Sequence, residues 1–276
     1  MTIKDENTLR REIVEIGRRV YERFLVAAND GNISARLDGE TALVTPTGVS
    51  KGFMSVEDII KVSLGGRKNN PQARRVSRRK LVTEKDVLAA PPDGQLFVPQ
   101  EALVTPLARQ IALERRVTLT KAGMTPPAAG ERRPSSETPM HLAIYRARPD
   151  VNAIVHTHAP SITAFALTDA PLDESLMPEV LASIGQVALV PYASPGTEEL
   201  PQAMTSYLVD HDAFLLANHG AVTVGSSLEE AYFRMERLEL FARIRLAAQA
   251  LGTEKRLPPQ EVERLLALHE KSRDAS

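Results

Sequence analysis

Three histidines in two short sequence contexts are the side chains of this protein best suited to bind a metal ion. His156 and His158 are separated by one threonine, and His219 lies within Asn-His-Gly. Alternate side chains of an extended strand share a face, so the first two would point the same way, roughly 6.5–7 Å apart along the backbone. A lone histidine is more often a satisfied polar group at a strand end. This spacing, together with the third histidine, favours a three-histidine site with one zinc position open to water or substrate.

Both histidine contexts follow short apolar segments. Residues 153–155 (Ala-Ile-Val) and 214–217 (Phe-Leu-Leu-Ala) have the composition of buried strands. Each predicted strand leads directly to histidine. We therefore expect the two strands to deliver all three imidazoles to one place.

Two small-polar turns near the N-terminus offer groups that suit an anion. An amphipathic helix is predicted over residues 8–28, followed by a turn at residues 29–34 that enters a strand. A second short strand at residues 42–45 ends at Pro-Thr-Gly, residues 46–48. Hydroxyls, amides and exposed backbone N–H groups on such turns can hold phosphate. Taken alone, each segment is more often only a turn.

A third segment combines two serines with a carboxylate at a predicted helix start. Pro134 ends any preceding helix, and Ser135 and Ser136 precede a helix predicted over residues 140–146. Hydroxyls and amides placed there face the positive end of the helix dipole, which again suits phosphate. Glu137 either complements that dipole or, beside a metal, moves protons or completes the coordination shell.

The composition is that of an ordinary globular protein. The 276 residues are 43% hydrophobic and carry a net charge of -1, so no basic field points to nucleic acid. No apolar run is long enough for a membrane span, and the first residues lack the apolar core of a signal peptide. Because there is no cysteine, a metal must be held by histidine and carboxylate. We expect a cytoplasmic location.

The character of the sequence changes between Gly65 and Gly130. Residues 67–80 are rich in Arg and Lys, and either bind an acidic partner or phosphate or form a solvated surface. The pattern beyond them predicts helices at residues 83–88 and 105–116 and strands at residues 95–98 and 117–120. We interpret residues 66–129 as an inserted small α+β subdomain that interrupts one domain spanning residues 1–276.

Six motifs occur in the order seen in the class II aldolase/adducin family. They are G-N-I-S at residues 31–34, T-P-T-G at 45–48, P-S-S-E at 134–137, V-H-T-H at 155–158, P-Y-A-S-P-G-T-E-E-L at 191–200 and N-H-G at 218–220. Their combined order is far more specific than any single motif. The chain resembles this family, and most closely its bacterial L-fuculose-1-phosphate aldolases. The resemblance implies an α/β fold, with three α/β/α layers on a largely antiparallel central sheet, and a homotetramer with active sites at subunit interfaces.

The resemblance also assigns roles to single residues. The implied zinc ligands are His156, His158, His219 and, in the resting state, Glu137. Glu137 is also the implied catalytic base. The implied phosphate-binding residues are Asn32, Thr47, Gly48, Ser135 and Ser136, with Ser34 as a neighbour in the same loop.

The implied reaction is cleavage of a ketose 1-phosphate, L-fuculose 1-phosphate or a similar one. Zinc would stabilise an enediolate, and the products would be dihydroxyacetone phosphate and a small aldehyde such as lactaldehyde. A pentulose-5-phosphate 4-epimerase is the first alternative, but epimerases of this family typically have Asp where this chain has Glu137. A methylthioribulose-1-phosphate dehydratase is the second. A non-catalytic adducin-like module predicts eroded metal ligands, and here all are present.

Two departures from the family pattern affect the prediction. The stretch at residues 176–179, which corresponds to the segment carrying the usual general-acid tyrosine, has none, so that role is unassigned. The insertion faintly resembles proteins of bacterial microcompartments, with which the enzyme would then associate. An amphipathic stripe near the C-terminus is also predicted to dock onto a partner or to pack within the tetramer. Its members are Val262, Leu265, Leu266 and His269.

Overall fold

The chain forms two compact units, described in turn. The computed structural model describes residues 5–65, 81–88, 95–98, 103–115, 118–121 and 132–274. One unit combines Met1–Gly66 with Arg132–Ser276, and the other is Arg67–Glu131. The histidines and the predicted phosphate loops all belong to the first unit, so this unit positions the site.

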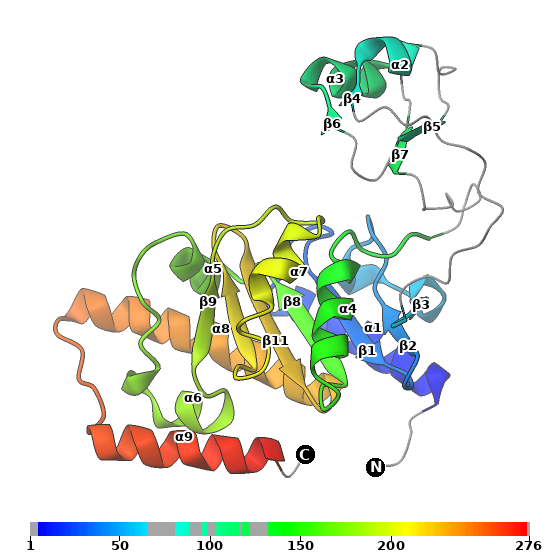
Figure 1. Ribbon diagram of the computed structural model, residues 1–276. Coiled ribbons are helices and arrows are strands. Elements are labelled where there is room, and N and C mark those ends of the chain that lie inside the picture. Colours follow the sequence, from blue (N-terminus) through cyan, green and yellow to red (C-terminus); the bar gives the residue numbers. More distant parts are fainter. Residues whose placement is uncertain are drawn as a thin grey trace. The chain divides into compact units, whose positions relative to one another are not determined.

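A mixed sheet forms the centre of the first unit (Figure 1). Among the described residues it has seven strands, in the order β3-β2-β1-β8-β11-β10-β9. They are β1 (Asn32–Arg36), β2 (Thr41–Val44), β3 (Ile60–Ser63), β8 (Ala153–Thr157), β9 (Val187–Val190), β10 (Ala213–Leu216) and β11 (Gly220–Gly225). Every neighbouring pair is antiparallel except β9 with β10. The predicted largely antiparallel sheet is confirmed.

Helices cover both faces of this sheet, because successive strand residues point to opposite sides. They are α1 (Glu6–Glu22), α4 (Thr138–Ala147), α5 (Pro160–Ala166), α6 (Pro178–Ser183), α7 (Glu199–Met204), α8 (Leu228–Leu251) and α9 (Pro259–Asp274). On β8, Val155 belongs to the core shared with α1, α5 and α8. Its neighbour Ile154 belongs to the core shared with α4 and α7. The predicted three-layer α/β/α fold is confirmed (Figure 1).

The opening helix α1 forms where the apolar spacing predicts it. Leu9, Ile13 and Val20 are buried on its sheet-facing side. Asp5 caps the helix, since its carboxylate accepts a hydrogen bond from the backbone N–H of Thr8. The helix ends at Glu22, six residues earlier than the apolar pattern indicated.

The C-terminal helix α9 packs against α6 of its own chain (Figure 1). Leu265 and His269 are buried there. Gly185, just after α6, has φ +74°, and a Cβ at this position would lie 2.6 Å from His269 Cδ2. The sequence left open whether this stripe docks onto a partner or packs within the assembly, and Leu265 and His269 pack within their own subunit.

The second unit is small and contains parallel strand pairs. Its elements are β4 (Leu81–Val82), α2 (Glu84–Leu88), β5 (Gln95–Val98), β6 (Leu103–Val104), α3 (Pro106–Glu114) and β7 (Thr118–Lys121). β4 pairs with β6 and β5 with β7, both in parallel. Val87, Ala108 and Ala112 form its core. The predicted helices and strands of this segment are confirmed, whereas the basic run at residues 67–80 lies outside the described residues.

None of the helices in the described parts of the chain is long and apolar enough to cross a membrane.

Candidate metal centre

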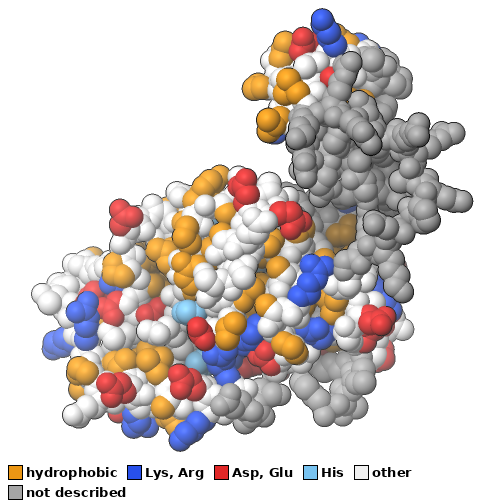
Figure 2. Space-filling model, in the orientation of Figure 1, with side chains coloured by type: hydrophobic (Ala, Val, Ile, Leu, Met, Phe, Trp, Pro, Cys, Tyr) orange, Lys and Arg blue, Asp and Glu red, His pale blue; other side chains and the backbone are white. Residues whose placement is uncertain are grey.

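The three predicted histidines converge. One nitrogen of each of His156, His158 and His219 lies within 4.8 Å of the corresponding nitrogens of the other two. The ring centroids are 4.8–5.0 Å apart, and the Nε2 atoms of His156 and His158 are separated by 3.2 Å. His158 and His219 are partly exposed. On the face of the first unit seen in Figure 2, acidic and basic side chains are interspersed with hydrophobic ones. The cluster is open to a ligand.

The backbone that delivers these side chains depends on one glycine. His156 lies within β8 and His158 just beyond its end, whereas His219 occupies the turn between β10 and β11. In that turn Asn218 has φ +59°. A Cβ on Gly220 would lie 2.5 Å from the carbonyl oxygen of Thr157 and 2.8 Å from the His158 ring. The Asn-His-Gly sequence is therefore what allows the two strand ends to approach closely.

Glu137 lies against two of the imidazoles, at the N-cap of α4. Its two carboxylate oxygens are 3.0 Å from His156 Nε2 and 2.9 Å from His219 Nε2. The side-chain amide of Asn32 donates a third, 2.6 Å hydrogen bond. Burial alone would raise the pKa of Glu137, but the charge and hydrogen bonds of the two histidines outweigh it and hold the pKa well below its ordinary value. The group is a carboxylate at neutral pH.

The outer nitrogens of the histidines have different partners. His156 Nδ1 lies 2.9 Å from the carbonyl oxygen of Ala221, to which it can donate, and this leaves the Nε2 lone pair facing the centre. His158 Nδ1 lies 3.8 Å from the carboxylate of Asp30. His219 Nδ1 is buried and has no hydrogen-bond partner within the described part of the chain.

The donor set fits a divalent transition metal. Burial and the two neighbouring imidazoles lower the pKa of His158 to about 4, so this ring is neutral at physiological pH. Neutral imidazole nitrogens with one carboxylate are ligands that zinc prefers, and three histidines leave a coordination position for substrate. The chemistry available is polarisation of a carbonyl next to a carboxylate able to move a proton.

The two predicted phosphate loops lie side by side. Pro46 and Pro134 form an isolated antiparallel bridge. The backbone N–H of Thr47 donates to the carbonyl of Arg133 at 2.8 Å, and that of Ser135 to the carbonyl of Thr45 at 3.1 Å. The chain folds this way because Pro46 and Pro134 cannot donate, so each loop leaves a regular ladder there. These bonds bring Thr47 and Ser135 together, although 88 positions separate them in the sequence.

The other predicted phosphate-binding residues surround this contact. Gly48 is exposed, with φ +71°, and a Cβ there would meet no atom within 4 Å. Ser136 is exposed and lies beside the turn at Gly196. Asn32 is different, because it is buried and its amide group is committed to Glu137. The structure thus places Asn32 at the carboxylate and the other residues at the loop surface.

Two buried polar residues near this centre were missed by the sequence analysis. His141 lies one helical turn after Glu137, and its Nδ1 is 2.6 Å from Ser34 Oγ, which in turn is 2.8 Å from the Tyr145 hydroxyl. Lys51 is buried three residues after Gly48. The i, i+4 spacing from Glu137 is a signal that could have identified His141, whereas Lys51 has no comparable spacing signal.

Comparison with known proteins adds independent information. The profile of the class II aldolase and adducin N-terminal domain matches residues 11–246. L-fuculose phosphate aldolase of Methanococcus vannielii is 30% identical over 234 residues, which cover 85% of this chain and 93% of the relative. 3-Oxo-tetronate 4-phosphate decarboxylase of Haemophilus influenzae is 29% identical over 237 residues, covering 84% of each. The crystal structure of YgbL from Klebsiella pneumoniae, described as an aldolase, epimerase or decarboxylase, superposes with a TM-score of 0.67 at 26% identity, over 95% of this chain and 99% of that one.

Proposed function

Because this chain belongs to the class II aldolase and adducin family and is an enzyme related to metal-dependent lyases, we propose that it is a zinc-dependent aldolase acting on a ketose 1-phosphate. The substrate would be L-fuculose 1-phosphate or a similar sugar phosphate. The products would be dihydroxyacetone phosphate and a small aldehyde such as lactaldehyde. The observation that carries this proposal is the position of Glu137 between His156 and His219.

The roles follow from the geometry of the residues. His156, His158 and His219 would bind the zinc, with Glu137 as a fourth ligand in the resting state. A bound metal would polarise the ketose carbonyl and stabilise the negative charge that develops when the carbon–carbon bond breaks. Glu137, held by the amide of Asn32, would then move the proton at the three-carbon fragment.

The phosphate group would be held at the paired loops. Thr47, Gly48, Ser135 and Ser136 line the loop surface, and Asn32 would orient both loop and carboxylate. The exposed serine and threonine hydroxyls are suitable donors for a phosphate dianion. A substrate anchored there would bring its carbonyl carbon to the histidine cluster.

Decarboxylation is the second candidate, favoured by the similarity to 3-oxo-tetronate 4-phosphate decarboxylase over most of the chain. Loss of carbon dioxide from such a 3-oxo acid breaks the bond between the carboxylate carbon and the carbon next to the ketone, and also yields dihydroxyacetone phosphate. The same negative charge has to be stabilised and the same proton added. An epimerase stays a weaker alternative, because epimerases of this family typically have Asp where Glu137 follows the paired serines. A dehydratase stays a further alternative.

One experiment separates the two candidates. Zinc-loaded and chelator-treated protein would be incubated with L-fuculose 1-phosphate or with 3-oxo-tetronate 4-phosphate, and dihydroxyacetone phosphate would be detected with a coupled dehydrogenase. Zinc-dependent release from the sugar phosphate supports the aldolase. Release only from the oxo acid, with carbon dioxide, supports the decarboxylase. No release from either substrate would contradict both.

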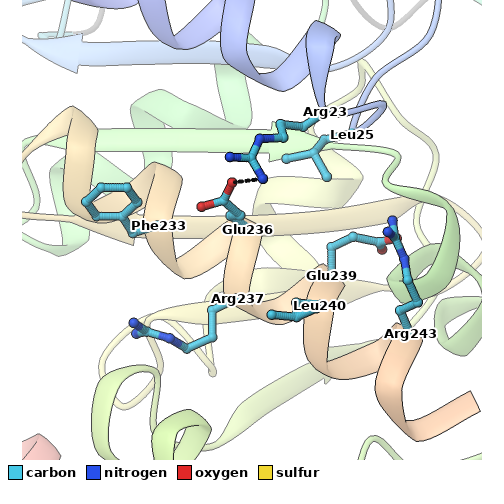
Figure 3. A pocket seen from close by; sticks show the side chains of 8 residues that line it. All are labelled: Arg23, Leu25, Phe233, Glu236, Arg237, Glu239, Leu240 and Arg243. Carbon is cyan, nitrogen blue, oxygen red and sulfur yellow. Dashed lines mark hydrogen bonds and ion pairs between the residues drawn. The ribbon is translucent and has the colours of Figure 1, made fainter. Parts of the chain in front are cut away.

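A homotetramer is the proposed assembly. A hollow of about 360 Å³ on the surface of α8 supports a protein contact there (Figure 3). Phe233 and Leu240 line it and are exposed, and the charged side chains of Arg237 and Arg243 lie at its edge. Sedimentation velocity would give the mass in solution. Cytoplasmic location and association with a bacterial microcompartment stay predictions from the sequence.

A further inference from the structure

Lys51 is a buried cation without an ionic partner. Its side chain is 1% exposed, and Nζ donates to the carbonyl oxygens of Asn29 at 3.0 Å and Val49 at 3.1 Å. Within the described part of the chain, Nζ forms no salt bridge with a carboxylate, and its hydrogen bonds go to these two carbonyls. An ammonium removed from water without a counter-charge is costly, so its presence calls for a compensating role.

The two carbonyls belong to two of the three segments that carry predicted phosphate-binding residues. Asn29 begins the turn that leads to Asn32, and Val49 directly follows Gly48. One ammonium group therefore joins segments that are twenty residues apart in the sequence. Because Val49 is the residue after Gly48, the ammonium group contacts the backbone next to that glycine.

The backbone around Lys51 is held firmly. Lys51 begins a short 3-10 helix, Lys51–Phe53, which packs against α1. A Cβ on Gly17 of α1 would lie 2.7 Å from the Lys51 carbonyl oxygen, and one on Gly52 would lie 2.5 Å from the Tyr21 ring. Two glycines thus permit the close approach of helix and loop. The base of the lysine side chain is therefore fixed, and its charged end contacts the carbonyls of Asn29 and Val49.

Burial and two nearby carboxylates act in opposite directions on the charge state of Lys51. Burial lowers its pKa to about 8, although the negative charges of Asp30 and Glu137 act in the opposite direction. An anion bound nearby would favour the charged ammonium form and would in turn be stabilised by it. A neutral, purely packing role would be filled better by an apolar side chain.

We propose that Lys51 is a positioning residue for the substrate phosphate: its buried ammonium group joins the two loops and supplies positive charge beneath the phosphate site. This inference rests on the proposed function, in which those loops bind a phosphate ester. It adds a residue to that site which acts through the loop backbone and through its charge, without belonging to the metal centre.

Three substitutions test the two parts of this role. Lys51→Met removes charge and donors, Lys51→Gln keeps a neutral donor, and Lys51→Arg keeps the charge. Binding of inorganic phosphate is measured by calorimetry on the zinc-loaded protein. We expect the dissociation constant to rise on the order of 10- to 100-fold for Met and Gln, as for loss of one charge a few ångströms away in a medium of intermediate dielectric. Arginine should recover most of the affinity.

The matched control is Lys61→Met, which removes an exposed lysine that pairs with Glu6. Its net charge equals that of the Lys51→Met variant. Zinc affinity is measured in parallel and should stay unchanged in all variants. Phosphate binding by Lys51→Gln equal to that of the unmodified protein would overturn the charge role. A parallel loss of zinc affinity would overturn it as well, because it would indicate general disruption.

The same experiment separates this inference from the proposed reaction. If dihydroxyacetone phosphate is released in the assay described above, the Lys51→Met variant should show a raised KM, with kcat within about threefold of that of the unmodified protein. This pattern is expected when the lost interaction is equally strong in the ground state and the transition state. If neither substrate is cleaved but phosphate binding still depends on Lys51, the reaction is wrong and the phosphate site stands. Absence of phosphate binding in the unmodified protein would overturn the phosphate site.

Discussion

Two buried clusters of charged groups in the first unit are built in opposite ways. In one, the carboxylate of Asp212 is buried among cationic side chains. In the other, Glu137 is a single carboxylate surrounded by imidazoles that lie against one another. Both carboxylates are buried, and the pKa of each lies below its ordinary value. The clusters differ in whether their polar atoms are satisfied.

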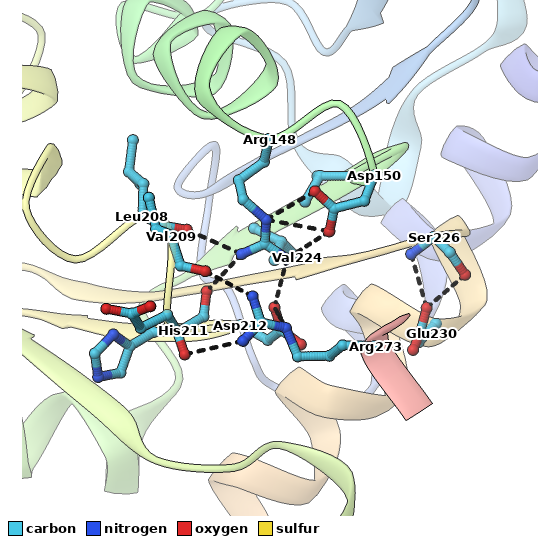
Figure 4. Close-up of polar contacts among 12 residues, drawn as sticks. Arg148, Asp150, Leu208, Val209, His211, Asp212, Val224, Ser226, Glu230 and Arg273 are labelled. Atoms are coloured by element: carbon cyan, nitrogen blue, oxygen red, sulfur yellow. Dashed lines mark hydrogen bonds and ion pairs between the residues drawn. The ribbon is translucent and has the colours of Figure 1, made fainter. Parts of the chain in front are cut away.

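The Asp212 cluster is saturated (Figure 4). The carboxylate lies 2.9 Å from Arg148, 3.2 Å from Arg234, 3.4 Å from His269 and 3.6 Å from Arg273. Arg148 also pairs with Asp150 and donates to two backbone carbonyls. These side chains come from the α4–β8 connection, the start of β10, α8 and α9. The cluster therefore holds separate elements together and leaves little capacity for a ligand.

The histidine cluster contains unsatisfied polar atoms. Asn32 Oδ1, His141 Nε2 and His219 Nδ1 are buried and have no hydrogen-bond partner in the described residues, and no atom of the Asp212 cluster shares that property. Buried polar groups are normally paired, so such atoms mark places where function outweighs stability. Asp212, paired with cationic side chains, stabilises the fold. Glu137, which lies among imidazoles, is suited to metal chemistry.

The largest expected effect follows from removing one histidine of the open cluster. His156→Ala should abolish both tight zinc binding and turnover, because the remaining donors no longer form a three-nitrogen set. Zinc content after dialysis against a chelator, measured by atomic absorption, and release of dihydroxyacetone phosphate test this together. His211→Ala is the matched control. Within the described part of the chain, the side chain of His211 forms one hydrogen bond, to the carbonyl of Tyr207. A fully active variant without metal would contradict the metal centre.

Glu137→Gln should separate metal binding from proton transfer. The amide keeps the size of the side chain but cannot accept a proton, so exchange of the dihydroxyacetone phosphate proton with solvent should fall by about 10²–10⁴-fold. Zinc should still bind through the three histidines. The exchange is followed by NMR in deuterium oxide, with Glu236→Gln on the surface of α8 as the control. Unchanged exchange would exclude Glu137 as the base.

The saturated cluster should respond in stability and not in activity. Asp212→Asn removes the buried counter-charge that Arg148 and Arg234 share and should lower the free energy of unfolding by about 3–5 kcal/mol. Denaturant unfolding measures this, and zinc affinity should not change. Asp210→Asn, at an exposed neighbouring position, is the control. Loss of zinc binding at unchanged stability would contradict the division between the two clusters.

The same carboxylate predicts a pH dependence. Its pKa in the folded protein lies well below the ordinary value of 3.8, because the neighbouring cations outweigh the effect of burial. The stabilisation it provides is therefore fully present above about pH 4 and is lost as the pH falls further. The variant Asp212→Asn should lose less stability than the unmodified protein over that acidic range. An equal loss in both proteins would contradict this role.

The contrast also explains what the sequence could and could not predict. The histidine pair, the third histidine and Glu137 were identified because a metal imposes residue type and spacing, and the family motifs fix their order. Short apolar runs before the histidines predicted the strands that carry them. These are local signals, and the structure brings the residues together as expected.

Asp212, His141 and Lys51 could not be identified in this way. Their partners lie far along the chain: Arg148 is 64 residues from Asp212, and Ser34 is 107 residues from His141. Lys51 pairs with backbone carbonyls, which leave no trace in residue type. Tertiary contacts between chemically ordinary residues have no sequence period, so only the fold reveals them.

The smallest predicted effect concerns the attachment of α9 to the Asp212 cluster. Gly185→Ala places a side chain at φ +74° and against the ring of His269, and should cost about 1–3 kcal/mol of stability. His269→Ala removes both the ring and its 3.4 Å contact with Asp212. If the steric contact dominates, the double variant should be more stable than the sum of the two single costs predicts, and denaturant unfolding of all four proteins measures this coupling. Strict additivity would show that the strained backbone alone sets the cost, and that the α9 contact with the saturated cluster is energetically independent of Gly185.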